Sequence, residues 1–194
     1  MKKAIFILLG FLVLVAFEFY PGSGILKSER GEVSFFSKAP IEDIDATSKN
    51  LVSVINTGTN EIAFYVSINS FQFDKPKMQT DFNENFMESG KHPVSSYKGK
   101  INEKIEWGKD GTHRITSKGI LTIHGVAKER TDTATVNIKD GAVSMKSDFL
   151  VRVTDHNIKI PQLLYRNIAE VVSVKLNVSY VEGTDEEMLN ALDK

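Results

Sequence analysis

Apolar and polar residues alternate along most of the chain from about residue 31 onward. Successive side chains of a β-strand point to opposite faces, so this alternation predicts strands with one buried face and one wet face. Such strands are typical of antiparallel sheets, because buried parallel strands tend to be apolar throughout. The pattern predicts eight strands, at residues 32–37, 51–55, 61–68, 94–107, 113–123, 131–139, 142–153 and 168–181.

Turn-forming residues separate these strands. Hairpins are expected at 56–60, at Lys109-Asp110-Gly111 and at Asp140-Gly141, and a turn or a single helical turn is expected at 40–48. The chain has no strand–helix–strand spacing and no internal repeat, which indicates an all-β barrel or sandwich. Two of the predicted strands are long, which favours closure into a barrel. We therefore predict an extended eight-stranded antiparallel β-barrel.

The inward faces of this barrel follow from the alternation. Three strands have the clearest apolar faces: Ile62, Phe64, Val66 and Ile68; then Val143, Met145, Phe149, Val151 and Val153; and finally Val172, Val174, Leu176, Val178 and Tyr180. Phe71 and Phe73 have odd numbers, whereas the apolar set just before them is even. If they also point inward, a bulge near Asn69-Ser70 must shift the register by one residue. Otherwise they belong to a different apolar surface.

One segment, MQTDFNENFMESGKHP at residues 78–93, interrupts the alternation. Asp81-x-x-Glu84 is expected to cap the N-terminus of a short helix, and Gly90 and Pro93 are expected to end it. Paired carboxylates can also perform acid–base chemistry, but capping explains these two more simply.

The same segment has an apolar side. Phe82 and Phe86 are spaced i and i+4, which places them on one face of the expected helix. A single short helix with one apolar face, within a chain of strands, is typical of a lid that closes a barrel end.

The two ends of the chain differ from the rest. Residues 1–24 contain a basic start and a 14-residue apolar run at 4–17, too short for the ~20 residues of a membrane-spanning helix and typical of a signal peptide. We expect an exported protein, periplasmic or secreted, with a membrane anchor at residues 4–19 as the alternative. Residues 25–181 form the barrel domain. Residues 182–194 form a tail or a short helix that begins at Thr184-x-x-Glu187.

Composition excludes several functions. The net charge of −1 provides no field for nucleic acid, and the chain has no cysteine for disulfides or thiol chemistry. The established catalytic and phosphate-binding motifs are absent, and the four histidines have no metal-ligand spacing. Asp155-His156 is the most catalytic-looking pair, and we interpret it as a polar turn at the barrel rim. We therefore expect no enzyme activity, no cofactor and no metal site.

Several motifs resemble the YceI-like family, and the resemblance spans about residues 26–181. The motifs are Gly31-Glu-Val-Ser-Phe35, Ser70-Phe-Gln-Phe73, Met78-Gln79, Phe82-Asn-Glu84, Lys91-His-Pro93 and Gly119-Ile-Leu-Thr-Ile-His-Gly-Val126. This resemblance implies a lipocalin-like barrel of exported bacterial proteins that hold polyisoprenoid or other long-chain lipids, without established enzyme activity. Two positions depart from the family pattern, the segment at 127–130 and Asp81, where the family often has histidine.

The functional prediction combines the apolar faces with this resemblance. A long-chain lipid, isoprenoid or related, is expected in a channel and lid formed by Phe35, Ile62, Phe64, Val66, Ile68, Phe71, Phe73, Met78, Phe82, Phe86, Leu121, Met145, Phe149, Val151, Val174 and Leu176. A phosphate head group would meet basic or imidazole side chains at the rim, namely Lys91, His92, Arg152, His156 and Arg166.

Other interpretations stay open at the level of sequence. The barrel core could be filled by its own side chains. The protein could instead be a small secreted enzyme in which Asp155, His156 and Glu84 converge, or an interaction or stress-response module that docks through residues 184–194. Association with a membrane through an uncleaved N-terminus and a homodimer are also compatible with the sequence.

Overall fold

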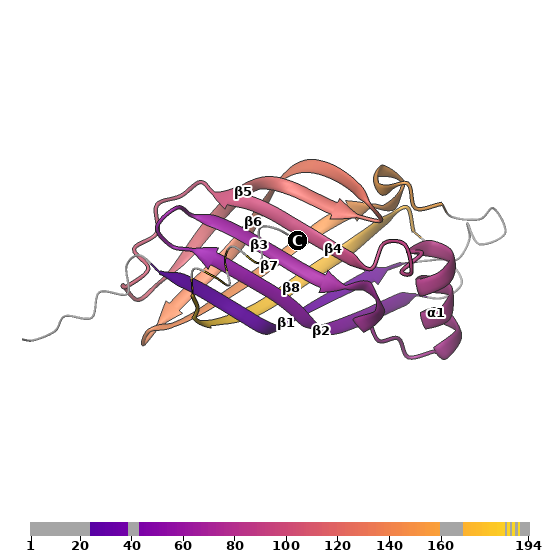
Figure 1. Ribbon diagram of the computed structural model, residues 1–194, viewed down its shortest axis with the longest axis horizontal. Helices are drawn as coiled ribbons and strands as arrows, with labels where there is room; N and C mark the ends of the chain where they lie inside the picture. Colours follow the sequence, from indigo (N-terminus) through magenta and orange to yellow (C-terminus); the bar gives the residue numbers. More distant parts are fainter. Residues whose placement is uncertain are drawn as a thin grey trace, which may run out of the picture.

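Eight antiparallel strands form a closed barrel in which each strand pairs with its neighbours in sequence and β1 pairs with β8 (Figure 1). The computed structural model describes residues 24–38, 43–159 and 169–184, together with 186, 188 and 190. The strands are β1 (Ile25–Ser37), β2 (Ile44–Asn56), β3 (Glu61–Ser67), β4 (Val94–Ile101), β5 (Gly111–Ile123), β6 (Val126–Lys139), β7 (Ala142–Arg152) and β8 (Val171–Glu182). The predicted barrel is confirmed.

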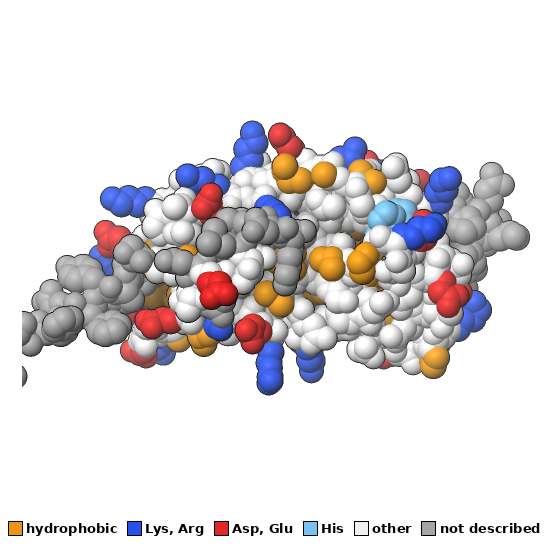
Figure 2. Space-filling view, in the orientation of Figure 1, with side chains coloured by type: hydrophobic (Ala, Val, Ile, Leu, Met, Phe, Trp, Pro, Cys, Tyr) orange, Lys and Arg blue, Asp and Glu red, His pale blue; other side chains and the backbone are white. Residues whose placement is uncertain are grey.

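Short helical segments lie between β3 and β4 and after β7. They are a 3₁₀ turn η1 (Ile68–Ser70), helix α1 (Pro76–Asp81), a π-helical segment η2 (Phe82–Phe86) that continues α1, and a 3₁₀ turn η3 (Val153–His156). Helix α1 lies at one end of the barrel, which we call the lid end (Figure 1). Charged side chains are spread over the face of the molecule that Figure 2 shows.

Several predicted boundaries were wrong: β1 begins at Ile25 rather than at residue 32, and β6 begins at Val126 rather than at residue 131. Residues 44–48, expected in a turn, begin β2, because Ser37↔Ile44 starts a ladder with β1 that overrides local turn preference. The strand expected at 94–107 ends at Ile101. The carboxylate of Glu103 accepts a hydrogen bond from the Thr116 amide of β5 (2.7 Å), so a side chain replaces the ladder where the chain leaves the sheet.

The register shift expected after β3 is present in a different form. The 3₁₀ turn η1, rather than a bulge, separates the even-numbered apolar residues of β3 from Phe71 and Phe73. Both sets therefore face the barrel interior, and the same cavity is lined by Ile68, Phe71 and Phe73.

The end of the barrel opposite the lid is filled by its own side chains. Buried residues there come from the last part of β4, the following loop and strands β6 to β8; they are Ile101, Ile105, Trp107, Val136, Ile138, Val143, Val178 and Tyr180. The Asp140 amide of the β6–β7 turn donates to Asp110 Oδ1 (3.0 Å), which joins two loops at this end. The filled-core interpretation is thus correct for one half of the barrel.

Met188, near the C-terminus, packs on the outside of the barrel. Residues 186, 188 and 190 are helical, and the Met188 amide donates to the carbonyl of Thr184 (3.2 Å). Met188 is buried against outward-facing residues of β1, β2 and β3, including Ile25, Val54 and Ala63. Residues 1–23 of the predicted signal or anchor segment, residues 1–24, lie outside the described part of the chain. Among the described residues, no helix is long and apolar enough to cross a membrane.

The filled end contains a buried hydrogen bond that can be tested by mutation. Ser53 Oγ and Tyr180 Oη lie 2.8 Å apart, and the Ser53 side chain is 0% exposed. We expect Tyr180→Phe to lower the free energy of unfolding by about 1–3 kcal/mol, because it leaves a buried hydroxyl without a partner. Urea denaturation measures this change.

The double variant Ser53→Ala/Tyr180→Phe provides the control. It removes both partners at once, so its loss of stability should be smaller than the sum of the two single losses. Additive losses would show that the two hydroxyl groups do not stabilise each other.

Candidate ligand-binding channel

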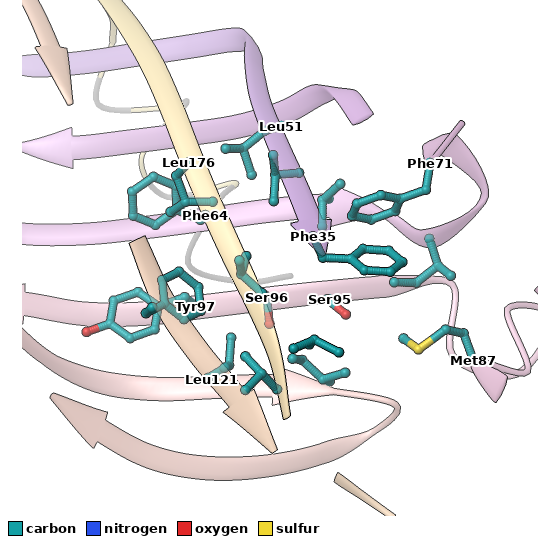
Figure 3. Close-up of a pocket in the computed structure, with 18 of the residues that line it drawn as sticks. Phe35, Leu51, Phe64, Phe71, Met87, Ser95, Ser96, Tyr97, Leu121 and Leu176 are labelled. Atoms are coloured by element: carbon teal, nitrogen blue, oxygen red, sulfur yellow. The ribbon is translucent and has the colours of Figure 1, made fainter. Parts of the chain in front are cut away.

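The half of the barrel nearer the lid encloses a cavity of about 490 Å³. This volume lies within the range of ~300–1,000 Å³ usual for small-molecule sites. Its wall is formed mostly by apolar side chains from every strand of the barrel, from the lid and from η1. Figure 3 shows Phe64, Tyr97 and Leu176 grouped toward one end of this space and Phe35, Phe71 and Met87 toward the other.

All sixteen predicted channel and lid residues lie on the wall of this one cavity. They are Phe35, Ile62, Phe64, Val66, Ile68, Phe71, Phe73, Met78, Phe82, Phe86, Leu121, Met145, Phe149, Val151, Val174 and Leu176. The alternation located those on the strands, because a closed barrel turns one face of each strand inward. Their contact with a lipid stays a prediction.

The cavity is also lined by residues that were not predicted from the sequence. The apolar ones include Val33, Leu51 and Ile115, which continue the inward alternation of β1, β2 and β5. Strands β4 to β7 also contribute polar residues to the wall: Ser95, Ser96, Tyr97, Ser117, Asp132, Thr133 and Ser147. An isolated hydroxyl residue carries no sequence signal for a cavity wall, since it suits either face of a strand.

The lid is held by aromatic contacts. The ring of Phe82 stacks on Phe35 of β1 with centroids 5.4 Å apart, and it contacts Phe71 at 5.7 Å and Phe73 at 5.0 Å. Each such aromatic contact contributes about 0.5–1.5 kcal/mol beyond burial of area. Phe35 of β1 thus joins three phenylalanines of the segment between β3 and β4 in one cluster at the lid end of the cavity.

The predicted cap of the lid helix was wrong. The helix begins earlier, at Pro76, whose ring presets the backbone angle of a first helical residue. Asp81 is therefore inside the helical segment, where its carboxylate binds Lys77 Nζ (2.6 Å) and Asn85 Nδ2 (3.2 Å). Glu84 is exposed and caps nothing.

Tyr97 lies across two glycines on the inner wall. Gly99 of β4 faces Gly119 of β5, and a Cβ at Gly99 would lie 2.6 Å from Tyr97 Oη and 2.8 Å from the Lys118 carbonyl oxygen. The hydroxyl of Tyr97 hydrogen-bonds with Ser117 Oγ (2.8 Å). Burial raises the pKa of Tyr97, so its phenol stays neutral. The glycines provide the space in which this ring lies.

The wall has a seam between β6 and β7. Their ladder runs only from Ala134↔Ser147 to Lys139↔Ala142, so the first part of β6 pairs with β5 alone. Arg130 bridges the seam: it pairs with Asp132, donates to the Leu150 carbonyl (3.2 Å) and lies over the Phe149 ring at 4.6 Å. The cavity reaches this seam, since Asp132 and Phe149 line it.

None of the predicted rim residues that the structure describes lines the cavity. Lys91 pairs with Glu88, Arg152 with Glu170 (3.4 Å), and the ring of His92 packs against that of His124. Arg166 lies outside the described residues. Among the described residues, the basic side chains on the cavity wall are instead those of Lys75 and Lys77, at the lid.

Asp155 and His156 form the polar turn that the sequence predicted. They belong to η3, and His156 is only 3% exposed, with its Nδ1 donating to the Val126 carbonyl of β6 (3.0 Å). Burial lowers the pKa of His156, so the ring is neutral at pH 7. His156 thus joins η3 to the start of β6, and Glu84 of the lid is not among its hydrogen-bond partners.

These features define a class of protein: a closed eight-stranded barrel with one filled end, one apolar cavity and an aromatic lid. Residues 24–180 match the model of the YceI-like domain, and the chain belongs to that family. The resemblance found in the sequence motifs is therefore confirmed. The chain matches none of the curated proteins with which it was compared.

Solved structures with 14–15% sequence identity share the fold. A polyisoprenoid binding domain from Saccharophagus degradans superposes with a TM-score of 0.72, covering 83% of this chain and 99% of that one, at 14% identity. BcnA from Burkholderia cenocepacia gives 0.65, with 77% and 95% covered at 15% identity. The YceI protein of Campylobacter jejuni gives 0.54, with 75% and 88% covered at 15% identity.

The aromatic cluster predicts how the lid responds to mutation. We expect Phe82→Ala to raise the amide hydrogen-exchange rate of residues 76–88 about tenfold, because several aromatic contacts of about 0.5–1.5 kcal/mol each are lost. Hydrogen-exchange mass spectrometry compares this segment with strands β5 and β6, whose exchange should be unchanged.

Glu84→Ala is the matched control, because Glu84 lies exposed on the same segment. It should leave the exchange of the lid within about twofold of the original protein. If Phe82→Ala accelerated amide exchange equally in the lid and in strands β5 and β6, the lid would have no opening motion independent of the barrel.

Proposed function

We propose that this protein is an exported binding protein that holds a long-chain isoprenoid or related amphiphilic lipid in its barrel, for carriage or storage. The observation that carries the proposal is the apolar cavity enclosed between the filled end and the phenylalanine lid. Membership of the YceI-like family supports it, as does the likeness to a fold whose Saccharophagus member is a polyisoprenoid binding domain.

The energetics of such binding need no reactive residue. Burial of a methylene group contributes ~0.8 kcal/mol, so a twelve-carbon stretch gains roughly 10 kcal/mol before ordering and association costs are subtracted. The remainder is sufficient for micromolar or tighter affinity. Three hydroxyls of the wall, those of Tyr97, Ser117 and Ser147, already have hydrogen-bond partners within the protein and are therefore compatible with an apolar chain.

The polar head group would lie at the lid end. Lys75 and Lys77 belong to the cavity wall there, and a diphosphate or phosphate would be attracted to their ammonium groups. This assignment replaces the predicted rim set. The opposite end is closed by buried side chains such as Trp107 and Tyr180, so a ligand would enter with its apolar chain first.

Export rests on the sequence of the N-terminus. A basic start followed by an apolar run of 14 residues is typical of a signal peptide, and the chain has no cysteine that an oxidising compartment would affect. Mass measurement of the protein from its own host distinguishes a cleaved signal from a retained anchor.

The primary test examines what the protein carries. Protein purified from its own host, without detergent, is analysed by native mass spectrometry and then by solvent extraction. We expect a bound long-chain lipid, and we expect delipidated protein to take up prenyl alcohols or prenyl phosphates of matching length. Protein that is empty and takes up none of these amphiphiles would contradict the proposal.

A matched pair of variants tests the location of the chain. Ala134 of β6 lines the cavity, and its neighbour Thr135 is exposed on the outer face of the same strand. We expect Ala134→Trp to weaken the binding of a long-chain prenyl phosphate at least tenfold, because the indole occupies the channel. Thr135→Trp should bind like the original protein. Binding is measured by displacement of a fluorescent fatty acyl probe, with circular dichroism to confirm folding.

A further inference from the structure

Three side chains with metal-binding groups converge beside the lid end of the barrel. Glu88 and His92 lie in the segment that connects the lid to β4, and His124 lies in the turn between β5 and β6. One ligand atom of each residue falls within 4.8 Å of the corresponding atoms of the other two. The scattered positions of the histidines in the sequence predicted no metal site, but the closed barrel brings two of them together.

The protonation of His124 is constrained by its hydrogen bonds. Its Nδ1 lies 3.2 Å from the carbonyl oxygen of His156, which can only accept, so Nδ1 must carry a proton. In the neutral ring, Nε2 then holds a lone pair. That atom lies 3.2 Å from Glu88 Oε2. Two lone pairs at this distance repel unless a positive species lies between them, which is either a proton or a metal cation.

Glu88 is ready to act as a ligand. Lys91 pairs with Oε1, whereas Oε2 faces His124. The side chain of His124 is 11% exposed, so the nitrogen that faces Glu88 is largely shielded from solvent.

The turn that contains His124 can be compared with another turn of the same chain. The β5–β6 turn, His124-Gly125, has positive φ angles of 51° and 71°, and the β6–β7 turn, Asp140-Gly141, has 50° and 78°. Asp-Gly and Asn-Gly are the pairs that favour such turns. The same backbone geometry is thus achieved elsewhere in this chain by the preferred residues. Turn geometry alone does not explain a histidine at position 124.

His92 is held against this turn. Its ring centroid lies 4.5 Å from that of His124, and a Cβ on Gly125 would lie only 2.8 Å from the His92 ring. The backbone between Glu88 and His92 is closed by amide hydrogen bonds from Lys91 and His92 to the Glu88 carbonyl (2.7 and 3.0 Å). Glu88 itself has a positive φ of 42°, a strained conformation for a residue with a side chain.

We propose that Glu88, His92 and His124 bind a divalent transition-metal ion of the zinc class. Two imidazoles and one carboxylate are a ligand set that Zn²⁺ accepts, with water or a ligand oxygen in the fourth position. The hydrogen bond from His124 Nδ1 to a backbone carbonyl is the arrangement that orients metal-bound histidines. Tetrahedral ligand atoms lie about 3.3 Å apart, so small side-chain rotations complete the site.

The ion would join two distant segments of the chain. Glu88 and His92 follow the lid, and His124 belongs to the barrel wall, so the metal would fasten the end of the lid segment to the β5–β6 turn. This inference does not depend on the proposed lipid function, because all three ligands lie outside the cavity wall.

The test uses the full chain without a histidine tag, treated with EDTA, delipidated and then transferred to buffer free of chelator. Isothermal titration with Zn²⁺ at pH ~7.5 should show one ion bound with micromolar or tighter affinity, and Co²⁺ should give the visible absorption of a four-coordinate site. Zn²⁺ should also raise the melting temperature.

Three variants remove one ligand each while keeping the fold. His124→Asn introduces a residue that tolerates the positive φ angle of this position. His92→Phe keeps an aromatic ring against Gly125, and Glu88→Gln keeps the size and shape of the side chain. Each should weaken Zn²⁺ binding at least tenfold. His113→Gln is the control, since His113 is a histidine of β5 outside the cluster, and its variant should bind like the original protein.

Two results of these zinc titrations would contradict the proposed metal site. If the original protein binds Zn²⁺ no more tightly than His124→Asn, the positive species between His124 and Glu88 is a proton and the cluster is an ion pair. If His113→Gln loses as much affinity as the three ligand variants, the measured binding is to scattered histidines. Either result overturns the proposal. Lipid uptake is measured separately, so a failure here is distinguishable from a failure of the proposed function.

Discussion

The ladder between β1 and β8 is the interaction on which the rest of the structure depends. It closes the sheet, removes its two edges and forces alternate residues of each strand into one enclosed space. Side chains as large as Trp107 and Tyr180 fill that space at one end. Toward the lid the inward residues do not meet across the barrel, and an apolar cavity of about 490 Å³ remains.

A half-hollow barrel must protect the apolar surface at its mouth. The chain does so between β3 and β4, where the 3₁₀ turn resets the register and the lid brings Phe82 against Phe35, Phe71 and Phe73. The incomplete β6–β7 ladder is compensated by Arg130, which spans the seam and covers the cavity wall.

Much of the fold and of the cavity wall could be predicted from sequence, because both follow from alternation within single strands. The errors occur where pairing with another strand, or the effect of one residue such as Pro76, outweighs the local sequence pattern. The start of β2 is formed by pairing with β1, despite turn-forming residues before it. The lid helix begins at Pro76, so the plausible cap at Asp81 is used for an ion pair with Lys77 instead.

The sequence by itself determined the class of fold, the inward faces of the most clearly alternating strands and the family, because these depend on residue spacing within short segments. Only the tertiary structure decided that the barrel is filled at one end and hollow at the other, since that depends on how side chains from all strands meet. It also decided that Glu88, His92 and His124 converge, while Lys91 and His156 lie off the cavity wall. Loops far apart in sequence become neighbours only when strand lengths and registers bring them to the same end of a closed sheet.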